Sequence, residues 1–262
     1  MRNHSMSIQS NDVLGIYGLC RSCQVGKSCL LKNLPEKDIE QFEHIVERKL
    51  LLKKAAHLFR QNQNFSSIYV VQSGTLKSYS SSFDNNEQIT RVHFPGDIIG
   101  LSAIAKKIHP NSVKALETAT VCELPYTSIQ DLCRQLPDLQ QNLFKLISNE
   151  VHKIQQQRAC LRQKSAEARY AAYLLGVYGH NTQRGHVSHK IQLCMSRYDI
   201  SNYLNLAQET VCRVSSRFQK KGLISIDNET INLIELESLE KIAGPAWQML
   251  KMSQPSQEIS VS

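Results

Sequence analysis

The sequence predicts an α+β fold in which a β-rich segment is followed by a long helix and then by two helices around a tight turn. Three observations support this fold class. Short β-rich runs alternate with turn residues between residues 57 and 126, which is typical of a small barrel or roll. Residues 137–162 carry apolar side chains at helical spacing, and residues 196–221 contain two helical patterns separated by a turn.

The composition limits the class of protein. The 262 residues are 41% hydrophobic, which is enough for a packed interior in one large domain or two ordinary ones. No run of about 18 apolar residues occurs, so we expect no membrane span, and the first 20 residues lack the apolar core of a secretory signal. We therefore expect a cytoplasmic protein with reduced thiols. The net charge of +8 favours an anionic partner, nucleic acid first, although a basic balance also serves solubility alone.

Three of the eight cysteines lie close together in the stretch CRSCQVGKSC, at Cys20, Cys23 and Cys29. The residues between them are too polar to form a core, so burial does not explain these thiols. In a reducing compartment such a group indicates metal or redox chemistry rather than disulfides. Four thiolates bind an iron–sulfur cluster, but they equally satisfy tetrahedral zinc. The spacing therefore leaves both kinds of site open and requires a fourth ligand.

The first half of the chain shows one helical pattern and several strand patterns. Residues 35–49 carry apolar side chains at helical spacing, which predicts a short amphipathic helix. The run SIYVVQSGTLKSYSSSF predicts two strands around Gly74, and QITRVHFPGDIIG predicts a strand, a turn at Pro95–Asp97 and a short apolar strand. KALETATVCELPY supplies another strand pair.

The long helical segment carries a heptad pattern. Its apolar seam, which we call the helix seam, consists of residues that step by 4, 3, 4 and 3 along the chain: Ile147, Val151, Ile154, Arg158 and Leu161. This spacing predicts pairing with a second helix, although a helix packed on its own domain shows the same pattern over two heptads. Arg158 on the seam costs stability unless it reaches a carboxylate or solvent. A further helix over 166–179, capped by Ser165, and a polar loop at 180–190 come next.

The last third of the chain predicts a helix-turn-helix. Ser196, with Asp199 three residues later, resembles a capping box at the start of the first helix. Asn205 suits the left-handed backbone that a tight turn between two helices requires. The second helix then buries a stripe of three apolar side chains, namely Val211, Val214 and Phe218.

The second helix has a polar face opposite this stripe. At about 100° per residue the face gathers Glu209, Cys212, Arg213 and Ser216, flanked by Arg217, Lys220 and Lys221. A DNA-recognition helix needs one buried face and one face able to enter the major groove. Arg213 can donate two hydrogen bonds to guanine and Glu209 can accept one from cytosine, while the later basic residues suit phosphates. A solvated charged face is the alternative. GLISIDNETINLIEL then predicts two short strands, as in a wing.

Four stretches together carry a resemblance to a known family. GTLKSY, NEQITRVHFPGDIIG, ALETATVCELPY and SRYDISNYLNLAQETVCRVSSRFQKKGLI resemble the FNR branch of the cyclic-AMP receptor and FNR superfamily of bacterial transcription regulators, over residues 18–250. The resemblance implies a β-roll sensor domain with its cysteine loop (20–136), a long dimerisation helix (137–164) and a C-terminal winged helix-turn-helix domain that binds DNA (165–252). A flexible N-terminus (1–19) and a disordered tail (253–262) flank them.

The resemblance also implies a cofactor, a signal and partners. Members of this branch hold a [4Fe–4S] cluster with three N-terminal cysteines and one from the roll, and the matching residue here is Cys122. At low oxygen the protein is then a homodimer, joined by the helix seam, on a palindromic DNA site, and oxygen releases it. RNA polymerase is a further expected partner, with the turn at Asp84–Glu87 as a candidate surface.

Some positions depart from the patterns of the superfamily. Its nucleotide-binding members carry a Gly-Glu pair and an Arg-Ser/Thr pair in the roll, where this chain has Leu101 and Asn111–Ser112, so we expect no cyclic nucleotide. Cys212 replaces a serine that is common in the recognition helix, which weakens one base contact because a thiol is a poor hydrogen-bond partner. Ala207 stands where a capping threonine is common.

Three alternatives remain at the level of sequence. One keeps the fold and changes the signal to nitric oxide, redox state or iron supply. Another is a zinc-stabilised DNA-binding regulator, for which Cys122 is the deciding ligand. The third is an electron-transfer enzyme that uses the cluster, but the chain carries no glycine fingerprint for flavin or nicotinamide. We therefore expect no catalytic residues and no enzyme.

Overall fold

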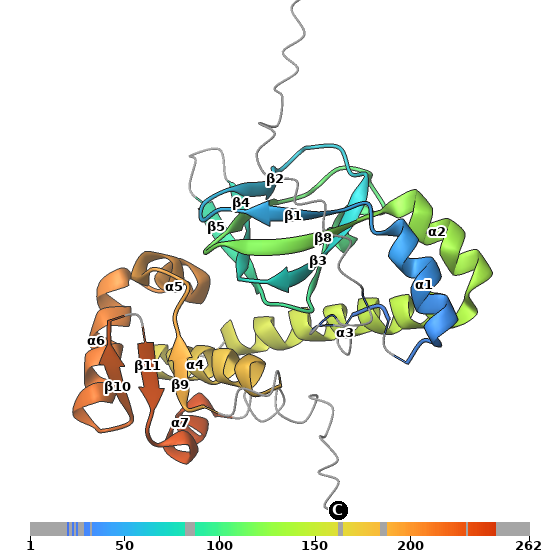
Figure 1. The fold of residues 1–262 in the computed structure, drawn as a ribbon. Helices are drawn as coiled ribbons and strands as arrows, with labels where there is room; N and C mark the ends of the chain where they lie inside the picture. Colours follow the sequence, from blue (N-terminus) through green and yellow to red (C-terminus); the bar gives the residue numbers. More distant parts are fainter. Residues whose placement is uncertain are drawn as a thin grey trace, which may run out of the picture. The chain divides into compact units, whose positions relative to one another are not determined.

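The computed structural model describes residues 20, 23, 25, 29–31, 33–81, 87–161, 165–183, 188–228 and 230–244. The predicted flexible N-terminus and disordered tail lie outside these residues. The chain divides into two compact units, Met1–Ile147 and Ser148–Ser262. The long helix α3 (Pro137–Leu161) continues from the first unit into the second (Figure 1). The division falls within this helix, which we expected to form a segment of its own.

Two antiparallel four-stranded sheets form the β-roll of the first unit. The first sheet has the order β1 (Arg48–Leu52), β8 (Ala119–Pro125), β3 (Ser67–Ser73) and β6 (Ile98–Ile99), and the second has the order β2 (His57–Phe59), β7 (Ser112–Ala115), β4 (Leu76–Ser81) and β5 (Glu87–His93). The predicted turn at Gly74 is confirmed, with a φ of 75°. A Cβ there would meet the Thr118 carbonyl oxygen at 2.5 Å, so the turn requires glycine. KALETATVCELPY supplies β7 and β8, but each pairs with other strands.

Alternation along β3 and β8 gives the first sheet two apolar faces. Val71 and Val121 belong to the core between the two sheets. Their neighbours Val70 and Cys122 pack on the opposite face, against a second core that we call the helical core. This core is built from the cysteine loop, two short helices and the start of α3, and its largest fully buried members include Leu30, Phe42, Ile68, Leu124, Ile129 and Leu139.

The two short helices of this unit are α1 (Glu36–Ile45) and α2 (Tyr126–Gln135), which lie side by side (Figure 1). The predicted helix over residues 35–49 is wrong at its C-terminal end. Residues 48–52 form β1 instead, because they pair in register with β8, and this pairing with a distant segment overrides the helical pattern. The sequence analysis did not find α2.

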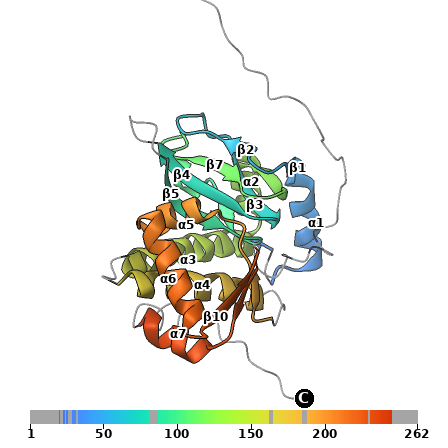
Figure 2. The same ribbon diagram turned by 90° about the vertical axis from the view of Figure 1, so that its left-hand side faces the viewer.

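The second unit combines four helices with a small sheet. The helices are α4 (Ala166–Gln183), α5 (Arg197–Leu204), α6 (Gln208–Lys220) and α7 (Leu236–Ala243), and the antiparallel sheet has the order β10 (Ile224–Asp227), β11 (Thr230–Leu233) and β9 (Lys190–Gln192). Helix α6 packs against α4, α5 and β10 (Figure 2). The predicted helix-turn-helix and two wing strands are confirmed, whereas β9 and α7 were not predicted. Residues 180–183 continue α4, so the predicted polar loop begins too early.

Candidate functional site

Three of the four predicted cysteine ligands lie on the helical core. Cys29 is buried within it, and Cys20 and Cys122 are half-buried against it. Cys122 reaches this face because side chains alternate along β8. The amide of Cys23 donates to the carbonyl of Cys20 at 3.1 Å, which holds the fourth thiol in the same loop. The fold therefore brings the N-terminal cysteines next to a cysteine of the roll.

Burial raises the pKa of all three thiols on the helical core. Burial, followed by the neighbouring Cys122 and Glu43 side chains, raises the pKa of Cys20 to about 12. Burial also raises the pKa of Cys29 to about 12, with smaller contributions from Cys20 and Cys122. The pKa of Cys122 is raised by burial too. Near neutral pH these bare thiols are protonated, and a positively charged centre would replace their protons.

Two groups of the first sheet face these thiols. Lys49 on β1 lies directly opposite Cys122 in the antiparallel register, and its ammonium lowers the pKa of both Cys122 and Cys20. Gln72 on β3 donates from its side-chain amide to the sulfur of Cys23, with 4.0 Å between nitrogen and sulfur. A cation and an N–H donor next to sulfur stabilise the thiolate form. Neither residue could be predicted from a local pattern, because strand register brings both to the cysteines.

The donor set fits an iron–sulfur cluster in its chemistry. Four thiolates are the usual ligands of a [4Fe–4S] cluster, and the apolar core beneath them limits the access of water. In the part of the chain that the structure describes, no three His, Cys, Asp or Glu side chains are close enough to share one metal ion. Four thiolates equally satisfy tetrahedral zinc.

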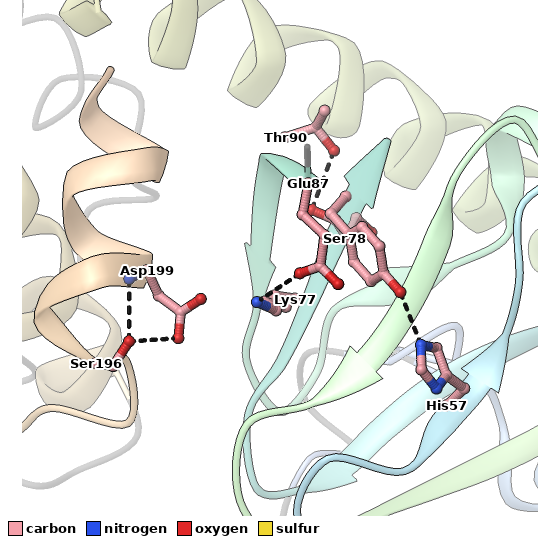
Figure 3. A network of polar contacts seen from close by, with 8 residues as sticks. His57, Lys77, Ser78, Glu87, Thr90, Ser196 and Asp199 are labelled. Atoms are coloured by element: carbon pink, nitrogen blue, oxygen red, sulfur yellow. Dashed lines mark hydrogen bonds and ion pairs between the residues drawn. The ribbon is translucent and has the colours of Figure 1, made fainter. Parts of the chain in front are cut away.

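Polar side chains inside the β-roll bind one another (Figure 3). The ammonium of Lys77 lies 3.2 Å from the carboxylate of Glu87, and both residues belong to the β4–β5 pair. The hydroxyl of Ser112 on β7 accepts a hydrogen bond from the Gln61 amide at 2.9 Å. Leu101, half-buried, follows Gly100 at the end of the short β6. These are two of the positions at which nucleotide-binding members carry ligand-binding residues. Leu101 is apolar, and Ser112 is bonded to the protein backbone.

The helix seam is largely exposed where the structure describes it. Its most exposed apolar side chains are Val151 (50%) and Ile154 (48%), and Phe144, one heptad step before Ile147, is 63% exposed. Ile147 is half-buried, Arg158 is exposed, and the side chain of Leu161 lies outside the described residues. Phe144 was missed, although it stands three residues before Ile147 and continues the heptad steps. Exposed apolar side chains along one helix mark a surface that another protein chain covers.

Hydrogen bonds fix the turn of the helix-turn-helix. The hydroxyl of Ser196 accepts a hydrogen bond from the Asp199 backbone amide at 3.0 Å and donates one to the Asp199 carboxylate at 2.8 Å (Figure 3). Ser196 is therefore the N-cap of α5, as predicted, although the carboxylate bonds the hydroxyl rather than the Ser196 backbone amide of a full capping box. Asn205 ends α5 with a φ of 52°, also as predicted. Arg169 on α4 donates to the carbonyl oxygens of Leu204 and Asn205, at 2.9 and 3.1 Å. This arginine, which the sequence analysis missed, closes the C-terminal end of α5.

Helix α6 buries Val211, Val214 and Phe218 and exposes the opposite face. Of the residues that we expect to contact DNA, Cys212 is half-buried and the others are exposed: Glu209, Arg213, Ser216, Arg217 and Lys220. The Arg213 guanidinium lies 3.3 Å from the Thr210 hydroxyl. Arg217 donates to the carboxylate of Glu167 on α4 at 2.5 Å. A phosphate group would have to compete with this carboxylate for Arg217.

Comparison with known proteins identifies the family. The family model of the cyclic nucleotide-binding domain matches residues 49–136, and that of the Crp-like helix-turn-helix domain matches residues 168–242. The chain is 38% identical to the anaerobic regulatory protein of Haemophilus influenzae over 225 residues, which cover 86% of this chain and 88% of that protein. The chain belongs to the Crp/FNR family of transcription regulators.

Other members of the Crp/FNR family carry related names. Over 86% of its length the chain is 39% identical to the transcriptional activator protein anr of Pseudomonas aeruginosa and 36% identical to the fumarate and nitrate reduction regulatory protein of Escherichia coli, of which it covers 92% and 90%. FixK2 from Bradyrhizobium japonicum shares the fold, with a TM-score of 0.68 and 24% identity over 75% of this chain and 97% of that one. The chain is a transcription regulator and not an enzyme, and its family and its helix-turn-helix domain imply DNA binding and dimerisation.

The described residues test two further expectations only in part. Within the turn at Asp84–Glu87, residues 84–86 lie outside the described residues, while Glu87 begins β5 and pairs with Lys77. Among the helices that the structure describes, none is both long and apolar enough to cross a membrane.

Proposed function

We propose that this Crp/FNR-family regulator responds to oxygen through a [4Fe–4S] cluster held by Cys20, Cys23, Cys29 and Cys122. At low oxygen it forms a homodimer and binds palindromic DNA in the cytoplasm to control anaerobic gene expression. The observation that carries the proposal is the convergence of thiols from the N-terminal loop and from β8 on one apolar core. Two relatives named anaerobic regulatory protein, from Haemophilus influenzae at 38% identity and Aggregatibacter actinomycetemcomitans at 36%, support it.

The protein groups around the thiols suit this cofactor. When bound, the cluster supplies an oxygen-sensitive iron–sulfur centre with four thiolate ligands. Cys29 is buried, while Cys20 and Cys122 remain half-exposed, so small molecules have access to one side of the site. Lys49 and Gln72 offer positive charge and an N–H donor to the thiolates, and both reduce the cost of gathering negative charge on sulfur.

The helix seam and α6 suit the DNA-binding step. Pairing through Phe144, Val151 and Ile154 would cover their exposed apolar surface. A two-fold dimer then presents two copies of α6 to half-sites about one helical turn of DNA apart. Arg213 and Glu209 are exposed on α6 for base contacts, and Lys220 near its end for a phosphate.

The residues of the roll favour a regulator that binds no cyclic nucleotide. Leu101 offers no carboxylate for a ribose hydroxyl, and Asn111 offers no positive charge for a phosphate. Lys77, a buried cation of this roll, is paired with Glu87. We expect RNA polymerase to be the partner through which the DNA-bound dimer acts on transcription.

The iron and acid-labile sulfide contents of anaerobically purified protein test the proposal, together with its visible spectrum. We expect about four irons per chain, the number in a [4Fe–4S] cluster, and a broad brown absorption that air bleaches. The Cys122→Ala variant should lose both. The control is Cys133→Ala, which removes a buried thiol from the same helical core and should keep them.

Three outcomes would count against the oxygen-sensing cluster. Zinc in place of iron would support a zinc-stabilised regulator, and iron retained by Cys122→Ala would remove that residue from the ligand set. An air-stable spectrum that bleaches with nitric oxide would keep the fold and change the signal.

A further inference from the structure

A hydrogen bond joins the cysteine loop to the long helix within the first unit. The side-chain amide of Asn142 on α3 donates to the backbone carbonyl of Leu30 at 3.1 Å, across 112 positions of the sequence. Leu30 is fully buried and follows Cys29 directly. A carbonyl at such a depth needs a hydrogen-bond partner, so the loop conformation and the position of α3 depend on each other at this point.

Helix α3 carries this contact on one face and the helix seam on another. Leu139 is fully buried in the helical core, and Leu143 and Leu146 pack against that core. At about 100° per residue these leucines and Asn142 share one side of the helix. Phe144 and Val151, which are exposed, lie roughly a third of a turn or more from the centre of that side, whereas the exposed Ile154 lies near its edge. Within the first unit, α3 therefore contacts the cysteine loop through Asn142 and exposes Phe144, the first apolar side chain of the surface suited to a second chain.

We propose that Asn142 is a positioning residue that couples the state of the Cys29 loop to the dimerisation surface of α3. This inference rests on the proposed function and adds a residue to it. When Cys29 takes part in a ligand set, the adjacent Leu30 carbonyl is fixed, and Asn142 transfers that constraint to α3. When the ligand set is lost, the carbonyl is free to move and the amide no longer holds the helix in the same position.

The expected size of the coupling is that of one hydrogen bond. Losing the hydrogen bond between Asn142 and the Leu30 carbonyl should change the dimer dissociation constant of the cluster-loaded protein by about fivefold. The dimer dissociation constant of the cluster-free protein should stay nearly unchanged. Coupling between two equilibria is reciprocal. Dimer formation should therefore slow iron loss in the wild-type protein, and this dependence should weaken when Asn142 is replaced.

The test compares Asn142→Leu, which keeps the size of the side chain and removes its donor, with the wild-type protein. Iron content is measured first, and sedimentation then gives the dimer dissociation constant with and without the cluster. The rate of iron release to a chelator is measured at several protein concentrations. Asn149→Leu is the matched control, because Asn149 is exposed and stands seven residues further along α3. Asn142→Asp, with no amide donor, provides a second variant should the leucine impair folding.

We expect both Asn142 variants to bind iron like the wild-type protein. The effect of the cluster on the dimer dissociation constant should fall about fivefold, and the rate of iron release should depend less on protein concentration than in the wild-type protein. Asn149→Leu should match the wild-type protein. Normal iron content with an unchanged cluster effect in both Asn142 variants would overturn the role of Asn142 alone. A wild-type protein without iron would overturn the proposed function and this inference with it.

Discussion

At the scale of single residues, Lys49 is the charged group of the roll that favours the thiolate form of the cysteines. It lies opposite Cys122 in the register of β1 and β8 and lowers the pKa of Cys122 and Cys20. We expect Lys49→Gln to slow the alkylation of these thiols by iodoacetamide several-fold in cluster-free protein at pH 8, because the thiolate fraction falls. Lys53→Gln, at an exposed position beyond the end of β1, serves as the control. Equal alkylation rates in the wild-type protein and in Lys49→Gln would exclude this role.

His109 is the residue from which we expect acid sensitivity of the fold. Its ring is 2% exposed and stacks on Phe59 with 3.6 Å between ring centres, and burial lowers its pKa from 6.5 to about 4. The unfolded chain therefore binds a proton between pH 6.5 and about 4 that the folded chain does not. The contribution of neutral His109 to stability is complete above pH 6.5 and is lost as the pH falls towards 4.

Urea unfolding of cluster-free protein at pH 7 and pH 4.5 measures this contribution. We expect His109→Phe to lose less stability between these two pH values than the wild-type protein does. His44→Phe, at an exposed position on α1, should behave like the wild-type protein. The same loss of stability in wild type and His109→Phe would show that other groups cause the acid sensitivity.

At the scale of elements, we expect α6 to separate base contacts from phosphate contacts. We expect Arg213→Ala to weaken binding to the preferred site by about 1–3 kcal/mol and to relax the preference at one base pair. Lys220→Ala should weaken binding to all sequences alike and lower the slope of the salt dependence by about 1. Fluorescence anisotropy with matched and mismatched duplexes, at several salt concentrations, distinguishes the two. Similar loss of sequence preference in both variants would contradict these assignments.

The helix seam predicts how the dimer responds to one residue of α3. Arg158 is exposed and would enter an otherwise apolar interface. We expect Arg158→Leu to tighten the dimer by at least about tenfold, since burial of a leucine side chain contributes about 1.5–3 kcal/mol. Lys145→Leu, on the opposite side of α3, should leave the dimer dissociation constant unchanged in sedimentation experiments. A weaker dimer in Arg158→Leu would mean that Arg158 forms an ion pair across the interface.

Local patterns predicted some elements well and others not at all. Periodicity and turn residues were sufficient for α3, α6 and the turns at Gly74 and Asn205, because capping and backbone preferences act over a few residues. They failed for β1, where pairing with the distant β8 overrides a helical pattern. They also failed for α2 and α7, which follow the strands β8 and β11 closely and have no pronounced start signal in the sequence.

The same distinction holds for the candidate site. The three N-terminal cysteines and the polar face of α6 could be found from spacing alone, since each lies within one short segment. Cys122 required resemblance to a family, because only the order of the strands brings it to the loop. Lys49, Gln72, Asn142 and the Glu167–Arg217 ion pair depend on contacts between segments far apart in the sequence, for which a single sequence carries no local signal.

At the scale of the whole molecule, α3 belongs to both units, and in the proposed function the first unit senses and the second binds DNA. The first unit gathers the cysteine thiols on the core that also receives the start of α3. The second unit presents α6 with an exposed polar face. A ligand changes such a system only through its different affinity for the two states of the coupled equilibrium. In the proposed function those states are the monomer and the DNA-binding dimer.

The most direct measurement is the DNA affinity of one anaerobic, iron-loaded sample before and after exposure to air. The probe is a palindromic duplex selected from a random library by that sample, and fluorescence anisotropy gives the dissociation constant. We expect air to weaken binding by about 5- to 150-fold, the usual range for coupled sites, and to leave the already weak binding of Cys122→Ala unchanged. Equal affinity before and after air, with the iron lost, would contradict control of DNA binding by the cluster.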